Sequence, residues 1–104
     1  PRGERRVDDG PGLGPGTALT PDQRAFLEPR LGADLGAVRL HADGTAAATA
    51  SALGARAFAV GHDIGFAPGR YRPETAGGRF LLAHELAHVL QQRQGVGEPS
   101  QAHE

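Results

Sequence analysis

The feature that most constrains the fold is the stretch of residues 80–90, which reads as a helix with apolar side chains around most of its circumference. At about 100° per residue, two sides of this helix carry three apolar residues each, namely Leu82, Leu86 and Val89, and Ala83, Ala87 and Leu90. A helix that is apolar on most sides has to be buried, so the rest of the chain must pack around it. We expect it to run from about Thr75 to Gln94, with Gly95 as its C-terminal stop.

Two histidines and a glutamate interrupt this apolar helix at His84, Glu85 and His88. Buried ionisable groups are costly unless they are paired or bound to a metal ion. His84 and His88 are four residues apart and leave one helix face, where two imidazoles can bind one zinc ion at ~2.0–2.1 Å. Glu85 lies beside them, where it can take a proton from a zinc-bound water. The His-Glu-x-x-His pattern therefore predicts a zinc site with Glu85 as the catalytic base, and the alternative is a cluster that serves only packing and hydrogen bonding.

The third metal ligand does not follow from the helix itself. The positions three and six residues beyond His88, where an extended motif has glycine and histidine, hold Gln91 and Gln94. His41 is the best candidate, because it ends a predicted strand that could lie beside the helix. Weaker candidates are His62 in a predicted turn, His103 near the end of the chain, and Glu98 or Glu104 if that end folds back.

Two glutamines follow the motif on the same helix. Gln91 projects from the face of His84 and His88, and Gln92 lies near Glu85. Each is a candidate for binding the second nitrogen of a ligand or a substrate carbonyl. The alternative is that both belong to an exposed helix end.

Composition excludes several classes of function. The 104 residues include no cysteine, so disulfides and thiolate metal ligands are impossible. The formal net charge of −1 gives no electrostatic reason to expect a nucleic-acid partner. No apolar run reaches the ~18 residues of a membrane span, and the first residues do not read as a signal peptide.

The remaining elements are predicted from caps and turns. Thr20 and Gln23 are predicted to form a capping box, with Pro21 at the first position of a helix that ends at Gly32. A strand over residues 38–41, a helix from Asp43 or Thr45 to Leu53, and a hairpin of residues 57–60 and 64–67 follow. Residues 1–16 are predicted to be a flexible Gly/Pro-rich linker and residues 96–104 a flexible tail.

Three blocks of the sequence, residues 32–41, residues 55–58 with 61–64, and residues 81–92, resemble the family DUF4157. That family is also called the core domain of extracellular contractile injection systems. The resemblance covers about residues 17–94 and implies a zinc metallopeptidase domain of a bacterial effector or toxin. It assigns His84, Glu85 and His88 as motif residues, and His41 as a position where the family also has histidine. It further implies a cytoplasmic stage before loading and delivery out of the cell by an injection particle.

We therefore predict a small α+β domain over residues 17–95, with about three helices and a short antiparallel sheet of about three strands, resembling a minimal zincin. The predicted function is zinc-dependent hydrolysis of a peptide bond, in which Glu85 assists the attack of zinc-bound water. The substrate would be a peptide or protein, including the domain's own parent chain, and the partners would be components of the injection particle. The alternative is a non-catalytic packaging or docking module with a structural or vestigial metal site.

Overall fold

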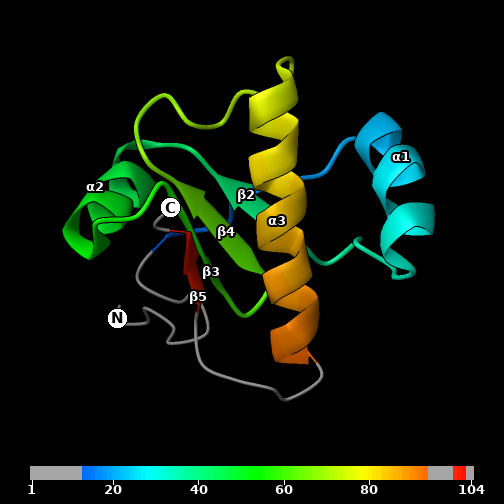
Figure 1. Cartoon of the computed structure of the whole chain (residues 1–104). Helices are drawn as coiled ribbons and strands as arrows, with labels where there is room; N and C mark the ends of the chain where they lie inside the picture. The colour runs from blue at the N-terminus through cyan, green and yellow to red at the C-terminus, as the bar shows by residue number, and fades with distance from the viewer. Residues whose placement is uncertain (1–12, 94–99, 103–104) are drawn as a thin grey trace.

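A computed structural model of the chain describes residues 13–93 and 100–102. Its elements are β1 (Thr17–Ala18), α1 (Pro21–Leu31), β2 (Arg39–His41), α2 (Gly44–Leu53), β3 (Ala57–Val60), β4 (Asp63–Phe66), α3 (Ala76–Arg93) and β5 (Ser100–Ala102). The strands form one sheet in the order β1-β2-β4-β3-β5. Helices α1 and α3 cover one face of this sheet, and α2 covers the other (Figure 1). The predicted α+β class and the predicted three helices are confirmed.

The sheet differs from the antiparallel one that the sequence predicts. Strands β2 and β4 are parallel, while the other neighbouring strands are antiparallel. The reason is the path of the chain: after β2 it crosses through α2 to β3, and the β3–β4 hairpin then brings β4 back beside β2. Strand β5 lies in the segment predicted to be a tail. Residues 1–12, 94–99 and 103–104 of the predicted linker and tail lie outside the described residues.

Helix α1 begins and ends where its capping residues predict. The Thr20 hydroxyl accepts a hydrogen bond from the backbone N–H of Gln23 at 3.0 Å, and the Gln23 side chain accepts one from the backbone N–H of Thr20 at 2.8 Å. This reciprocal pair satisfies two backbone donors that the first turn of a helix leaves open. At the other end Gly32 adopts a left-handed conformation with φ of 67°, which glycine reaches without steric cost.

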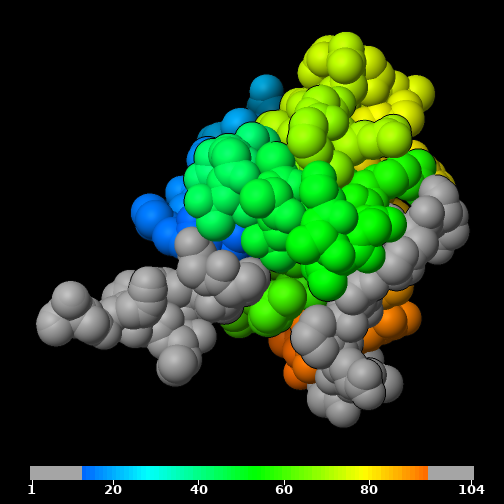
Figure 2. All heavy atoms as spheres, turned by 90° about the vertical axis from the view of Figure 1, so that its left-hand side faces the viewer, coloured from blue at the N-terminus to red at the C-terminus, as the bar shows by residue number. Residues whose placement is uncertain are grey.

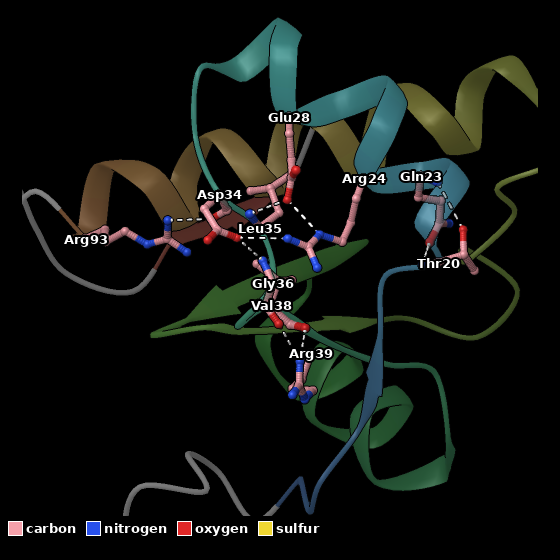
Figure 3. Close-up of polar contacts among 10 residues, drawn as sticks. All are labelled: Thr20, Gln23, Arg24, Glu28, Asp34, Leu35, Gly36, Val38, Arg39 and Arg93. Atoms are coloured by element: carbon pink, nitrogen blue, oxygen red, sulfur yellow. Dashed lines mark hydrogen bonds and ion pairs between the residues drawn. The ribbon is translucent and has the colours of Figure 1, made fainter.

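A polar network joins α1 to the loop that follows it (Figure 3). Arg24 Nε donates to Glu28 Oε2 at 2.7 Å, Arg24 Nη2 donates to Asp34 Oδ1 at 3.1 Å, and the backbone N–H of Leu35 donates to Glu28 Oε2 at 2.8 Å. The Leu35 N–H and the Arg24 guanidinium lower the pKa of Glu28 below its ordinary value. We call residues 20–36, which contain this network, the α1 corner.

Apolar side chains pack on both faces of the sheet. On the face covered by α1 and α3, Leu40 and Ile64 join residues of both helices in the main core. On the opposite face Phe58 packs with Ala46 and Ala50 of α2, and α2 lies at the centre of the view in Figure 2. Because successive strand residues point to opposite faces, each strand contributes to both layers. Within the described residues, no helix is long and apolar enough to cross a membrane.

Candidate metal centre

Helix α3 carries the predicted site and packs against the sheet through one side. Its buried residues are Leu81, Leu82, Glu85, Leu86 and Val89. They recur at three- and four-residue intervals, so they form one stripe that faces the strands. The helix contacts β3, β4 and β5, which places it over the β3 side of the sheet.

His84 and His88 converge beside this buried stripe. Their Nε2 atoms are 3.2 Å apart, and the two rings meet edge to face with centroids 4.7 Å apart. Two nitrogens bound to one zinc ion at ~2.0–2.1 Å in a tetrahedral arrangement would lie about 3.3 Å apart. The Phe80 ring, 69% exposed, stacks beside His84 from one turn earlier, with ring centroids 6.2 Å apart. The separation of the two nitrogens therefore fits a pair of ligands for one tetrahedral metal ion.

The described residues do not complete such a site. Across residues 13–93 and 100–102, no group of three or more His, Asp or Glu side chains is gathered around one point where a metal ion could bind. The second ring nitrogen of His88, Nδ1, is buried and has no hydrogen-bond partner among those residues. A metal-binding histidine usually donates a hydrogen bond from that atom to a carboxylate or carbonyl group. The two histidines thus fit two of the ligands of one metal ion.

Glu85 belongs to the buried stripe, directly after His84 in the sequence, and it is completely shielded from solvent. Its side chain is directed toward the core, next to Leu81, Leu82 and Leu86 on the inner side of α3. A carboxylate that assists water attack has to reach both a water molecule and the substrate. In the observed state the predicted base is therefore close to the histidines along the helix but closed to bulk water.

His41, the predicted third ligand, lies on the other face of the sheet. Its neighbour Leu40 belongs to the core below α1 and α3, so His41 points to the α2 face. There it is buried, and its Nε2 is 2.7 Å from Asp63 Oδ1. The structure does not bring His41 together with His84 and His88. It forms a His–Asp pair that the sequence analysis did not find, because only the parallel pairing of β2 and β4 brings these two residues together.

Of the two predicted supporting glutamines, one is exposed and the other binds the backbone. Gln91 is exposed on α3. Gln92 donates from Nε2 to the carbonyl of Ala59 at 3.1 Å, and its Oε1 accepts from the backbone N–H of Gly61 at 3.0 Å. Gln92 therefore ties α3 to the β3–β4 hairpin. No local pattern indicates this contact, since it joins residues more than thirty positions apart.

The weaker candidate ligands lie apart from the site or outside the described residues. His62 is exposed in the turn of the β3–β4 hairpin, where its carbonyl accepts from the backbone N–H of Arg39 at 2.9 Å. His103 lies outside the described residues, as do Glu98 and Glu104. The site seen in the structure therefore consists of His84 and His88, with Glu85 behind them.

Comparison with known proteins adds a family to this geometry. Neither the curated proteins nor the solved structures contain a significant match to the chain. The family described as the eCIS core domain matches residues 18–96, which include every element from α1 to α3. This match covers most of the sequence and includes the two converging histidines. The chain accordingly belongs to the eCIS core domain family.

Proposed function

We propose that this domain is a zinc-dependent metallopeptidase of a protein associated with a contractile injection system. Membership of the eCIS core domain family supplies the association with injection systems and with delivery through an injection particle. The peptidase part is supported by one observation, the 3.2 Å separation of the Nε2 atoms of His84 and His88. That distance suits two ligands of one tetrahedral ion.

In this proposal each residue of the motif has its own role. His84 and His88 hold the metal ion through Nε2, and Phe80 stacks beside the ring of His84. When bound, the ion supplies Lewis-acid chemistry for attack on a peptide carbonyl. Glu85 accepts a proton from the attacking water and returns it to the leaving amine, which requires that its carboxylate become accessible. The substrate is a peptide or protein, and the parent chain of the domain is one such protein.

The first experiment measures bound zinc. The purified chain is dialysed against zinc at neutral pH and then against metal-free buffer, and its metal content is determined beside that of His84→Ala and His88→Ala. We expect about one zinc ion per chain, with loss of the ion in both variants. His62→Ala is the matched control, because His62 is an exposed histidine of the hairpin turn near the end of α3 and is not grouped with His84 and His88. A chain that retains no zinc, or variants that retain it as well as the parent chain, would refute the metal site.

The second experiment separates catalysis from metal binding. The zinc-loaded chain and Glu85→Gln are incubated with an unfolded protein, and the products of that protein and of the chain itself are followed by mass spectrometry. Glutamine keeps the size of glutamate but cannot accept the proton, so we expect Glu85→Gln to keep zinc and to lose cleavage. Equal cleavage by both proteins would exclude Glu85 as the base.

A second candidate function is a packaging or docking module that carries no catalytic activity. It is favoured by the complete burial of Glu85 and by the lack of a third ligand among the described residues. A metal ion closed by four protein ligands would support it, whereas an open coordination position would support the peptidase. Under this candidate, zinc-loaded chain cleaves neither unfolded protein nor itself, and Glu85→Gln behaves like the parent chain.

A further inference from the structure

We propose that Ser100–Ala102 occupies the edge of β3 where an extended peptide substrate would bind, so that this segment has to leave before a substrate can lie beside His84 and His88. The proposal names the binding mode of the substrate, and for its catalytic consequence it rests on the proposed peptidase function. Three observations support the proposal. They are the position of a row of α3 side chains, the direction of the β3 backbone groups and the burial of Glu85.

His84, His88 and Gln92 follow one another at four-residue intervals on α3 and form a single row along the helix. Gln92 places this row against β3, because its amide donates to the carbonyl of Ala59 at 3.1 Å. Toward the start of both elements, Leu81 of α3 and Arg56, which precedes β3, line the same small cavity. The helix and the strand therefore run side by side in the same direction, as Figure 1 shows.

This alignment places His88 along β3. His88 is four residues before Gln92, which is about 6 Å back along α3. Two residues of strand, from Ala59 back to Ala57, cover a similar length of about 6.6 Å. His88 consequently lies about level with Ala57, and His84 lies one turn beyond it.

The backbone groups of Ala57 and Ala59 point to the outer side of β3, away from β4. The carbonyl of Arg56 accepts from the backbone N–H of Ala67, on the β4 side of the hairpin, at 2.9 Å. Because the direction of these groups alternates along a strand, those of Phe58 face β4, and those of Ala57 and Ala59 face outward. The bond from Gln92 to the Ala59 carbonyl agrees with this direction.

Strand β5 now pairs with that outer edge. In the antiparallel register Ala102 lies opposite Ala57, and Ser100 lies opposite Ala59. A row of outward N–H and C=O groups on a strand binds any extended segment through main-chain hydrogen bonds, whatever its side chains. The site next to His88 therefore already contains one extended segment, and that segment belongs to the chain itself.

The burial of Glu85 agrees with a closed state. Glu85 belongs to the buried stripe of α3 and follows His84 directly in the sequence, on the helix that contacts both β3 and β5. It is completely shielded from solvent. A substrate peptide cannot pair with β3 while β5 is bound there, because the peptide and β5 would need the same outward N–H and C=O groups of β3. Departure of β5 frees these groups for pairing with a peptide.

Proline substitution tests whether β5 can be displaced in the full chain. Since Ser100 and Ala102 lie opposite the outward residues of β3, their N–H groups donate across the edge, and Ser100→Pro with Ala102→Pro removes both donors. Gln101→Pro is the matched control, because Gln101 lies opposite Phe58 and its N–H points away from β3. Amide hydrogen exchange is then measured by NMR at each residue of β3.

We expect the double-proline variant to exchange its Ala57 and Ala59 amides much faster than the parent chain, while Phe58 and Val60 remain protected by β4. The control should resemble the parent chain. Unchanged exchange at Ala57 and Ala59 would overturn the proposal. Loss of protection at Phe58 and Val60 as well would also overturn it, because β5 would then be required for the sheet itself.

A peptide tests whether the freed edge accepts another segment. A synthetic peptide with the sequence of residues 97–104 is added to the double-proline variant and to the parent chain. We expect it to restore slow exchange at Ala57 and Ala59 of the variant and to bind the parent chain more weakly. No protection in the variant, or equal binding by both proteins, would overturn the proposal. These measurements require neither zinc nor cleavage, so a chain that shows displacement without hydrolysis would refute only the peptidase function.

Discussion

The α1 corner and the row of His84, His88 and Gln92 on α3 are held in place by contacts of different range. Within the corner, hydrogen bonds drawn in Figure 3 join residues 3, 4, 7 and 10 positions apart, and one further bond, from Arg93 to the carbonyl of Asp34, spans 59 positions. On α3, Gln92 binds backbone groups 31 and 33 positions away. A contact of short range follows from residue types and their spacing, whereas one of long range depends on the path of the whole chain. The region with the candidate chemistry is therefore the one whose surroundings the sequence specifies least directly.

The largest expected effect is at the start of α3, the helix that carries the row of His84, His88 and Gln92. A Cβ atom added at Gly78 would lie 1.8 Å from the carbonyl oxygen of Arg72, whereas one added at Gly77 would meet nothing within 4 Å. Gly78→Ala should lower the free energy of unfolding by about 1–3 kcal/mol through overpacking. Gly77→Ala should raise it by up to about 1 kcal/mol, because alanine favours a helix over glycine. Urea unfolding of the two variants measures both values, and equal changes would contradict the packing of α3 against residue 72.

A smaller effect is expected where α3 meets the hairpin. Gln92→Ala removes two hydrogen bonds to the backbone, each worth about 0.5–1.5 kcal/mol net, and should destabilise the chain by about 1–2 kcal/mol. Gln91→Ala is the matched control, because the neighbouring side chain is exposed. Thermal unfolding measures the loss of stability in each of the two variants. Similar losses in the two variants would show that the tie between α3 and β3 contributes little.

The α1 corner is tested through its cap. Thr20→Ala removes the hydroxyl that accepts from Gln23 and should cost about 1 kcal/mol. Thr45→Ala serves as its control, because Thr45 is exposed and helix α2 takes its capping bond from Asp43. Both values come from urea unfolding. A loss at Thr45 as large as that at Thr20 would mean that the capping box does not stabilise α1 in particular.

The smallest effect concerns Glu28 and depends on pH. Hydrogen bonds from Leu35 and Arg24 lower the pKa of Glu28 in the folded chain, so its charged form contributes stability at neutral pH. This contribution is lost as the pH falls from the ordinary carboxyl pKa through the lowered one. Glu28→Gln should therefore unfold at a lower temperature than the parent chain at pH 7, and the difference should shrink in acid. A difference that stays constant with pH would exclude this linkage.

Much of the fold could be predicted because its signals are local. The helix from Pro21 to Leu31 is confirmed with its capping box, and the helix from Gly44 to Leu53 begins after Asp43, one of its two predicted caps. The hairpin and the long helix are also confirmed. In each case a cap, a turn or an apolar period within a few residues decides the structure.

The sheet order and the surroundings of the site could not be predicted in the same way. Nothing near His41 indicates that β4 lies parallel to β2, so the sequence gives no sign of its pairing with Asp63. The spacing of His84 and His88 predicts that they meet, and their Nε2 atoms do. The same spacing does not indicate which parts of the chain lie opposite the two histidines. Which residues face the two histidines depends on how the chain brings β3 and β5 together beside α3.

The division of the sheet into two layers has a practical consequence for experiments on this domain. Helix α2 packs on the face opposite to α3, and its residue Ser51 is exposed. Because the sequence contains no cysteine, Ser51→Cys would introduce a unique thiol for a dye or for attachment to a surface. A domain immobilised through that thiol would leave the face of the sheet that carries α3 directed toward solution. Single-molecule or biosensor measurements could then follow metal ions and peptides arriving at α3 without interference from the attachment.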